Sequence, residues 1–178
     1  MTSLRLLTTI LPLFVLSMPV LAERADRDKP VNIVANKVTV DDRNKVHVFE
    51  GNVVLTQGTL TITGDKMVVT QDADGFQRGS ATGNAKQLAT FRQKRDNSTE
   101  YVEGEAERIE YDSRTERAKL FRSAKVSSGG DEVKGHYIEY DSISENYLVT
   151  NAPGDTKTTT GDNRVTTVIT PKQSSKAE

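Results

Sequence analysis

Apolar and polar residues alternate along most of the chain, with the period of two that half-buried β-strands produce. The clearest example is the stretch FEGNVVLTQGTLTITGDKM, in which Val53 and Leu55 alternate with polar neighbours before a turn at residues 56–59. Leu60 and Ile62 resume the alternation after the turn. This stretch therefore predicts a hairpin with one apolar face.

The same pattern recurs in short segments separated by turn residues about ten positions apart, which is typical of antiparallel all-β folds. No proline occurs between Pro30 and Pro153, as expected where every backbone amide is needed for hydrogen-bonded ladders. The predicted strands cover residues 31–40, 45–50, 52–56, 60–70, 85–93, 101–111, 118–127, 133–140, 146–150 and 165–170.

An internal repeat relates the two halves of the chain. A shift of 71 residues places residues 35–38, Ala-Asn-Lys-Val, on residues 106–109, Ala-Glu-Arg-Ile. A tetrad of a small, a polar, a Lys, Arg or Tyr, and an apolar residue begins at positions 35, 64, 106 and 135. Small residues inside strands mark bends, so the tetrads predict corners at fixed heights in stacked sheet layers.

The two halves of the repeat do not place their apolar residues at equivalent positions everywhere. Val46 and Val48 alternate on one phase, whereas Ala118 and Leu120 alternate on the other. This difference predicts a one-residue slip in a turn of the second half.

The chain ends differ in composition from the region between them. Residues 1–22 have Arg5 as their single charge, an apolar run and the small-residue site Val20-Leu21-Ala22, which together predict a secretory signal peptide. Residues 23–30 predict a flexible leader and residues 172–178 a disordered tail. One β-domain is expected over residues 31–171.

Charge and cysteine content exclude several classes of function. Without Arg5, 23 basic residues face 25 acidic ones, a net charge of about −2, so no basic footprint for nucleic acid is present. The chain has no cysteine, which excludes disulfides and a lipid anchor on cysteine.

No catalytic or cofactor site is predicted. His47 and His136 are the only histidines, and neither has a second ligand at metal-binding spacing. The carboxylates are scattered among lysines, as on a solvated face. We therefore expect no enzyme activity, no metal and no cofactor.

The apolar face of the strands is the remaining candidate site. Alternation alone is compatible with a closed core, but the residues on this face are mostly slender and β-branched, so the interior could also accept an acyl chain. The predicted lipid-binding residues are Val31, Ile33, Val40, Leu55, Leu60, Ile62, Met67, Val69, Phe91, Ile109, Tyr111, Val133, Ile138 and Tyr140.

Several runs resemble the lipopolysaccharide transport protein A (LptA) family, whose domain is also called OstA-like. They are PVNIVANKV, FEGNVVLTQGTLTITGDKMVVT, ATFRQKRDN, VEGEAERIEYD, EVKGHYIEY and RVTTVITP, in this order after the signal peptide. The resemblance covers about residues 30–171 and implies a single open-ended, twisted β-jellyroll of antiparallel strands.

The resemblance also implies a function and partners. Members of this family are periplasmic proteins of Gram-negative bacteria that stack head to tail, bridge the inner and outer membranes and carry lipopolysaccharide, with its lipid A, in an apolar groove. Their neighbours would be an inner-membrane LptC-like protein and an outer-membrane LptD-like protein. Val31, Ile33, Phe91 and Tyr111 fall nearest the family's lipid path.

This chain departs from the family pattern at three places. Gln71 and Ser113 stand where close relatives have a basic and an apolar residue, and the loop at residues 154–163 is long for the family. The resemblance therefore does not imply lipid contact at Gln71 and Ser113.

Unpaired first and last strands would supply the contacts for stacking. The predicted self-association residues are Val31, Ile33, Val38, Val165, Thr167, Val168 and Ile169. Two alternatives stay open: an exported structural or adhesive β-roll that binds glycan or protein on its outside, and a carbohydrate-active enzyme on a β-helix.

Overall fold

The computed structural model of the chain describes residues 26, 28–73, 75–96, 98–151 and 164–171. The predicted signal peptide, the predicted tail and the loop at residues 154–163 lie outside these residues. Every strand pairing is antiparallel, and the described part of the chain contains no helix of the length and hydropathy that a membrane span requires. The all-β prediction is confirmed.

Twelve strands form one continuous hydrogen-bonded sheet. They are β1 (Asn32–Val34), β2 (Lys37–Asp41), β3 (Val46–Gln57), β4 (Leu60–Asp72), β5 (Gly75–Thr82), β6 (Ala89–Lys94), β7 (Tyr101–Ala106), β8 (Arg108–Asp112), β9 (Arg117–Ser128), β10 (Asp131–Asp141), β11 (Asn146–Thr150) and β12 (Thr166–Val168).

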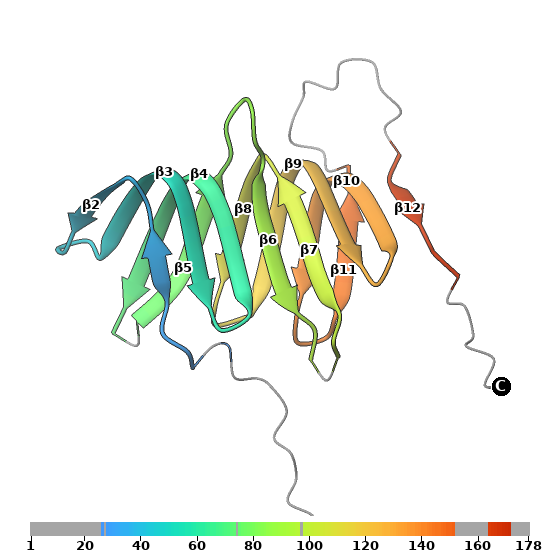
Figure 1. Ribbon diagram of the computed structural model, residues 1–178, viewed down its shortest axis with the longest axis horizontal. Helices are drawn as coiled ribbons and strands as arrows, with labels where there is room; N and C mark the ends of the chain where they lie inside the picture. The colour runs from blue at the N-terminus through green and yellow to red at the C-terminus, as the bar shows by residue number, and fades with distance from the viewer. Residues whose placement is uncertain (1–25, 27, 74, 97, 152–163, 172–178) are drawn as a thin grey trace, which may run out of the picture.

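The sheet folds into two layers that share the long strands β3, β4, β9 and β10. The first layer has the order β2-β3-β4-β5-β8-β9-β10-β11, and the second has the order β1-β3-β4-β6-β7-β9-β10-β12. In Figure 1, β6 and β7 of the second layer lie in front of β8 of the first. Within the part of the chain that the structure describes, strands β1, β2, β11 and β12 each pair with one neighbour, so the jellyroll is open at both ends, as the resemblance implies.

The layers are joined along one margin, the corner, where the shared strands bend. Strand β3 bends at Gly51 and Asn52, and β9 bends at Arg122 and Ser123, all with positive φ. The four tetrads lie at this margin. The break between β1 and β2 falls at Ala35 and Asn36, and the break between β7 and β8 falls at Glu107. The register of β10 against β9 shifts just after Gly135. Gly64 faces the corresponding shift in β3, so the predicted corners are confirmed.

The internal repeat extends over the whole described domain, with β1–β6 corresponding to β7–β12. Strand β3 begins and ends 71 residues before β9, and β2 has the same relation to β8. The pairings repeat as well: Thr61–Thr63 pair with β6, and Glu132–Lys134 pair with β12.

The predicted slip between the halves is wrong. His47 and Phe49 pair with Val69 and Met67, whose side chains are buried, and Phe49 packs against the core. Phe49 therefore corresponds to Leu120. Val46 and Val48 lie on the opposite face of β3, so the alternation that they show in the sequence belongs to the outer surface.

Several predicted strand boundaries also differ from the structure. Strand β5 was not predicted, because its two buried inward residues are Gly79 and Ala81, which give no hydrophobic signal. The predicted strands at residues 31–40 and 101–111 are each divided at the corner, whereas residues 45–50 and 52–56 belong to one bent strand.

Candidate functional site

The space between the two layers is the candidate site, and most of the predicted lipid-binding residues lie there. Ten of the fourteen are buried: Leu55, Leu60, Ile62, Met67, Val69, Phe91, Ile109, Tyr111, Ile138 and Tyr140. Val31, Ile33 and Val133 are partly buried against this core. Val40 is 49% exposed on the edge strand β2, so it does not lie in the interior of an isolated molecule.

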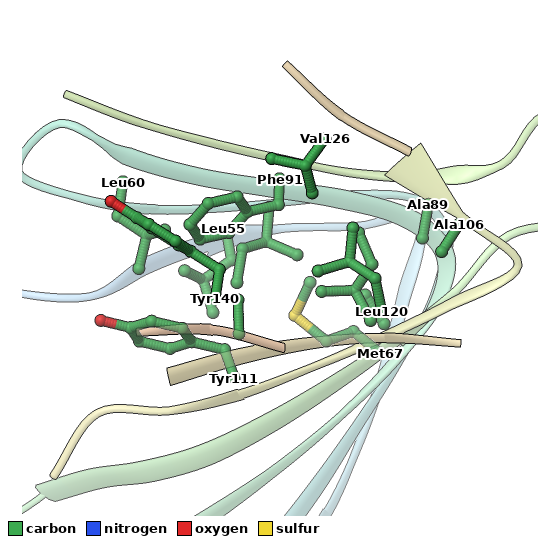
Figure 2. Close-up of a cluster of buried hydrophobic side chains, with 14 of the residues drawn as sticks. Leu55, Leu60, Met67, Ala89, Phe91, Ala106, Tyr111, Leu120, Val126 and Tyr140 are labelled. Atoms are coloured by element: carbon green, nitrogen blue, oxygen red, sulfur yellow. The ribbon is translucent and has the colours of Figure 1, made fainter. Parts of the chain in front are cut away.

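The deep part of this space is filled by the protein's own side chains. Figure 2 shows Leu55 and Phe91 of the second layer facing Met67, Tyr111 and Leu120 of the first, with Ala89 and Ala106 at the corner. The ring centroid of Phe91 lies 6.3 Å from that of Tyr111 and 6.1 Å from that of Tyr140. These aromatic contacts hold the two layers together.

The interior becomes more polar with distance from the corner. The hydroxyls of Tyr111 and Tyr140 point in the same direction, away from Ala89 and Ala106 (Figure 2). Burial raises the pKa of the Tyr140 hydroxyl above its ordinary value, which already lies well above neutral pH, so the interior holds this hydroxyl as an uncharged polar group.

Buried polar side chains continue this gradient at the strand ends farthest from the corner. Gln57 ends β3 and Gln93 lies next to the end of β6, each on the inward phase of its strand. In the first layer the Ser113 hydroxyl donates to the Phe76 carbonyl oxygen at 2.7 Å. Neither glutamine is among the residues predicted from the sequence, although each lies two positions after an apolar residue, Leu55 or Phe91, on the same phase of its strand.

We call the margin opposite the corner the seam, because turns of the two layers face each other there. The β3–β4 and β6–β7 turns of the second layer and the β10–β11 turn of the first lie along the lower edge of Figure 1. A hollow of about 920 Å³ opens at the seam between the layers. It is lined by Asp28, Lys29, Pro30, Val31, Gln57, Gln71, Asp72, Gly75, Phe76, Ser113 and Arg114.

One rim of this hollow is lined by the last residues of the predicted leader, Asp28, Lys29 and Pro30. The Thr59 backbone amide donates to the Asp26 carboxylate at 2.8 Å, and the Gln57 side chain donates to the Lys29 carbonyl oxygen at 3.1 Å. Gln71 and Ser113, the two departures from the family pattern, both line the hollow, so they face the seam and not the deep core.

An ion pair crosses the seam near the other end of the molecule. Arg95, in the β6–β7 turn, donates from Nη2 to the carboxylate of Glu145 in the β10–β11 turn, and from Nη1 to Glu100 at 3.2 Å. The hydrogen bond with Glu145 raises the pKa of Arg95, and an arginine side chain keeps its charge at any physiological pH. Arg95 lines a hollow of about 220 Å³ that also reaches Val126, Val133 and Tyr147.

The predicted self-association residues lie at the two open ends of the molecule. Val31, Ile33 and Val38 lie on or beside β1 and β2, whereas Val165, Thr167, Val168 and Ile169 lie on or beside β12. Val38, Val165, Thr167, Val168 and Ile169 are exposed. The structure therefore separates this set into two apolar edges, one at each end.

The two histidines occupy ordinary positions in strands. His47 stacks beside Phe49 on β3, and the His136 backbone amide donates to Asn151 near the corner. Among the described residues, no group of three or more His, Cys, Asp or Glu side chains could hold a metal ion.

Comparisons with known proteins agree with one another. The model of the family described as LptA/(LptD N-terminal domain) LPS transport protein matches residues 32–146. The chain is 31% identical to the lipopolysaccharide export system protein LptA of Haemophilus influenzae, over 88% of this chain and 86% of that protein. It is 33% identical to LptA of Escherichia coli K12, over 88% of this chain and 80% of that protein.

A solved structure is similar in fold and sequence. It is the crystal structure of LptH from Pseudomonas aeruginosa, described as the LptA-homologous periplasmic component of the conserved lipopolysaccharide transport device. The similarity has a TM-score of 0.75 at 29% sequence identity, and it covers 83% of this chain and 99% of the other.

Proposed function

Because the chain belongs to the LptA/(LptD N-terminal domain) family of LPS transport proteins, we propose that it carries lipopolysaccharide across the periplasm. In this proposal it is one link in a head-to-tail filament between the inner and outer membranes. The acyl chains lie between the two layers, and the sugars stay in solvent outside the seam. The observation that carries the proposal is the gradient from an apolar corner to a polar, partly hollow seam.

The gradient matches the chemistry of a glycolipid. Each methylene kept from water is worth about 0.8 kcal/mol, so exposing one acyl chain of a dozen carbons would cost roughly 10 kcal/mol. An apolar interior removes this cost, while Gln57, Gln93 and Ser113 lie where the acyl chain would meet the sugar.

The same architecture allows the layers to part at the seam. Among the described residues, every ladder pairs strands of the same layer, and the two layers are continuous only through the bent strands at the corner. Widening the seam therefore separates side chains and breaks no ladder hydrogen bond. The space that the deep side chains fill would open to acyl chains in this way.

The internal repeat supports head-to-tail stacking. Within the chain, β6 pairs with β7 and β5 pairs with β8, which joins the first repeat to the second. In the repeat, β12 corresponds to β6 and β11 corresponds to β5, whereas β1 corresponds to β7 and β2 corresponds to β8. By the same pairing, β12 and β11 of one copy would pair with β1 and β2 of the next copy, which continues both layers.

Burial at equivalent positions supports the same joint. Val38 and Val40 are 53% and 49% exposed, whereas Ile109 and Tyr111, 71 residues further on, are 1% and 4% exposed. Pairing β2 with β11 of a neighbouring copy would cover Val38 and Val40 as β5 covers their equivalents. The end strands would also dock LptC-like and LptD-like proteins at the two membranes.

Photo-crosslinking tests the lipid path. A photoreactive side chain at Ile33 or Phe91, which face the interior, should label lipopolysaccharide in cells. The adjacent outward positions Asn32 and Arg92 are matched controls and should give little labelling. Equal labelling at inward and outward positions would favour the alternative, a β-roll that binds glycan on its outside.

A further inference from the structure

The ion pair between Arg95 and Glu145 lies across the route that a bound glycolipid would follow. This inference rests on the proposed function. If acyl chains move between the layers while sugars move outside, the bonds that join them pass through the seam. Any contact that bridges the two layers at the seam must therefore break each time a lipid passes.

Arg95 and Glu145 make such a contact. Arg95 belongs to the β6–β7 turn of the second layer, and Glu145 belongs to the β10–β11 turn of the first. Their side chains are 31% and 30% exposed, so the pair is sheltered more than an ordinary surface ion pair but still meets solvent. Arg95 also lines the hollow that reaches Val126 and Tyr147.

A second observation points to a ligand at this place. Gln93, two residues before Arg95, is 8% exposed and lies on the same face of β6 as Phe91. Its Oε1 atom has no hydrogen-bond partner within the part of the chain that the structure describes. A buried acceptor without a donor is costly, and a hydroxyl or amide at the boundary between acyl chain and sugar would supply the donor.

We propose that the Arg95–Glu145 pair is a gate across the seam, which opens when Arg95 exchanges Glu145 for a phosphate of a passing glycolipid, with Gln93 accepting a donor from the sugar–acyl boundary. Arginine suits this exchange because its planar guanidinium carries several fixed N–H donors that bind carboxylate and phosphate alike. In this site Nη2 faces Glu145 and would accept the phosphate as a new partner, while Nη1 stays with Glu100. Glu100, on the same turn as Arg95, keeps the guanidinium oriented while Glu145 is released.

The two carboxylates also favour release of the phosphate. Glu100 and Glu145 compete with it for one guanidinium, so the gate closes again behind the lipid. Transport requires binding that is favourable enough to admit the ligand and weak enough to release it.

Locking the gate tests the proposal. The chain contains no cysteine, so the double variant Arg95→Cys/Glu145→Cys can be joined selectively with a short bis-maleimide that a reductant cleaves. The variant is first loaded with lipid A and then crosslinked, and transfer of lipid A to bead-bound copies of the unmodified chain is followed. We expect crosslinking to slow transfer at least tenfold and reductant to restore it.

The matched control is Arg92→Cys/Glu103→Cys. This pair is also an Arg–Glu ion pair, at 2.8 Å, but both residues lie in the second layer on β6 and β7. Crosslinking it should leave transfer unchanged. If the locked gate transfers lipid A at the rate of the unlocked protein, the gate is rejected. If the unlocked variant and the unmodified chain bind no lipid A at all, the proposed function itself fails.

The phosphate exchange has its own test. The unmodified chain should transfer lipid A several-fold faster than dephosphorylated lipid A, because only the former offers Arg95 a new partner. Glu145→Gln, which leaves Arg95 with Glu100 alone, should remove most of this difference by speeding the dephosphorylated lipid. Equal rates for the two lipids in the unmodified chain would reject the exchange.

Discussion

At the scale of single residues, the closeness of the two layers depends on positions without a side chain. Gly104 lies on β7, where it pairs with Phe91 and Val126. A Cβ atom at Gly104 would lie 2.8 Å from Cδ2 of Leu120, a fully buried side chain of the opposite layer. Leu120 thus occupies the space that a side chain at Gly104 would need.

We predict that Gly104→Ala lowers the free energy of unfolding by about 1–2 kcal/mol, because Leu120 must move in a packed core. Urea unfolding followed by circular dichroism measures the change. Gly79→Ala is the control, since its Cβ would meet only Phe76 side-chain atoms at 3.4 Å or more. If both substitutions have the same effect, the close contact with Leu120 does not limit the packing.

At the scale of elements, the sequence predicted the structure correctly where a small residue, or an alternation of apolar and polar residues, is compatible with only one local structure. The four tetrads predicted the corner correctly, because a strand that turns between layers has no room for a large side chain there. Strand β5, with the sequence GFQRGSAT, was not predicted because its buried inward residues are Gly79 and Ala81, which give no hydrophobic signal. The phase of β3 was misassigned because its outward valines are more hydrophobic than the inward His47.

One turn design recurs three times at this scale. The sequences DDRNK, DSRTE and DSISE begin at Asp41, Asp112 and Asp141, and each ends on a residue with positive φ. In each turn the aspartate carboxylate accepts a hydrogen bond from the backbone amide three residues later, at 3.0–3.2 Å. The carboxylate thereby satisfies amides that the strands leave unpaired.

These turns predict a loss of stability in acid. The amide of Ser144 holds the pKa of Asp141 below its ordinary value, and the side-chain and backbone amides of Asn44 do the same for Asp41. A folded-state pKa below the unfolded value stabilises the fold above about pH 4, and this contribution is lost as the pH falls through the folded pKa. The double variant Asp41→Asn/Asp141→Asn should therefore lose less stability between about pH 5 and pH 2 than the parent.

Urea unfolding at a series of pH values measures this slope. Asp42→Asn, the neighbouring position in the first turn, controls for the removal of negative charge. A double variant whose stability falls as steeply as that of the parent would show that these carboxylates do not drive the acid transition.

At the scale of the whole molecule, alternation identified the interior but not its layout. It could not show that Val40 lies on an edge while Tyr111, its equivalent, lies inside, because burial depends on a neighbouring strand that β2 lacks. Nor could it bring Arg95 to Glu145, which are 50 residues apart and meet only because the layers fold together. Tertiary contacts of this kind leave no local pattern.

The repeat also defines the register in which two copies would join. Phe91 pairs with Gly104 at the junction inside the chain. Thr167 corresponds to Phe91, because both lie opposite equivalent residues, Val133 and Ile62, and Ile33 corresponds to Gly104. Thr167 of one copy should therefore lie directly opposite Ile33 of the next, on the inward face.

Directly opposed residues in antiparallel strands are close enough for a disulfide. We predict that the double variant Ile33→Cys/Thr167→Cys forms a ladder of covalent oligomers on mild oxidation, seen on a non-reducing gel. Ile33→Cys/Thr166→Cys moves one cysteine to the outward face and should give far less product. If both variants crosslink equally, or if neither does while light scattering still detects filaments, then the joint between copies does not repeat the junction within the chain.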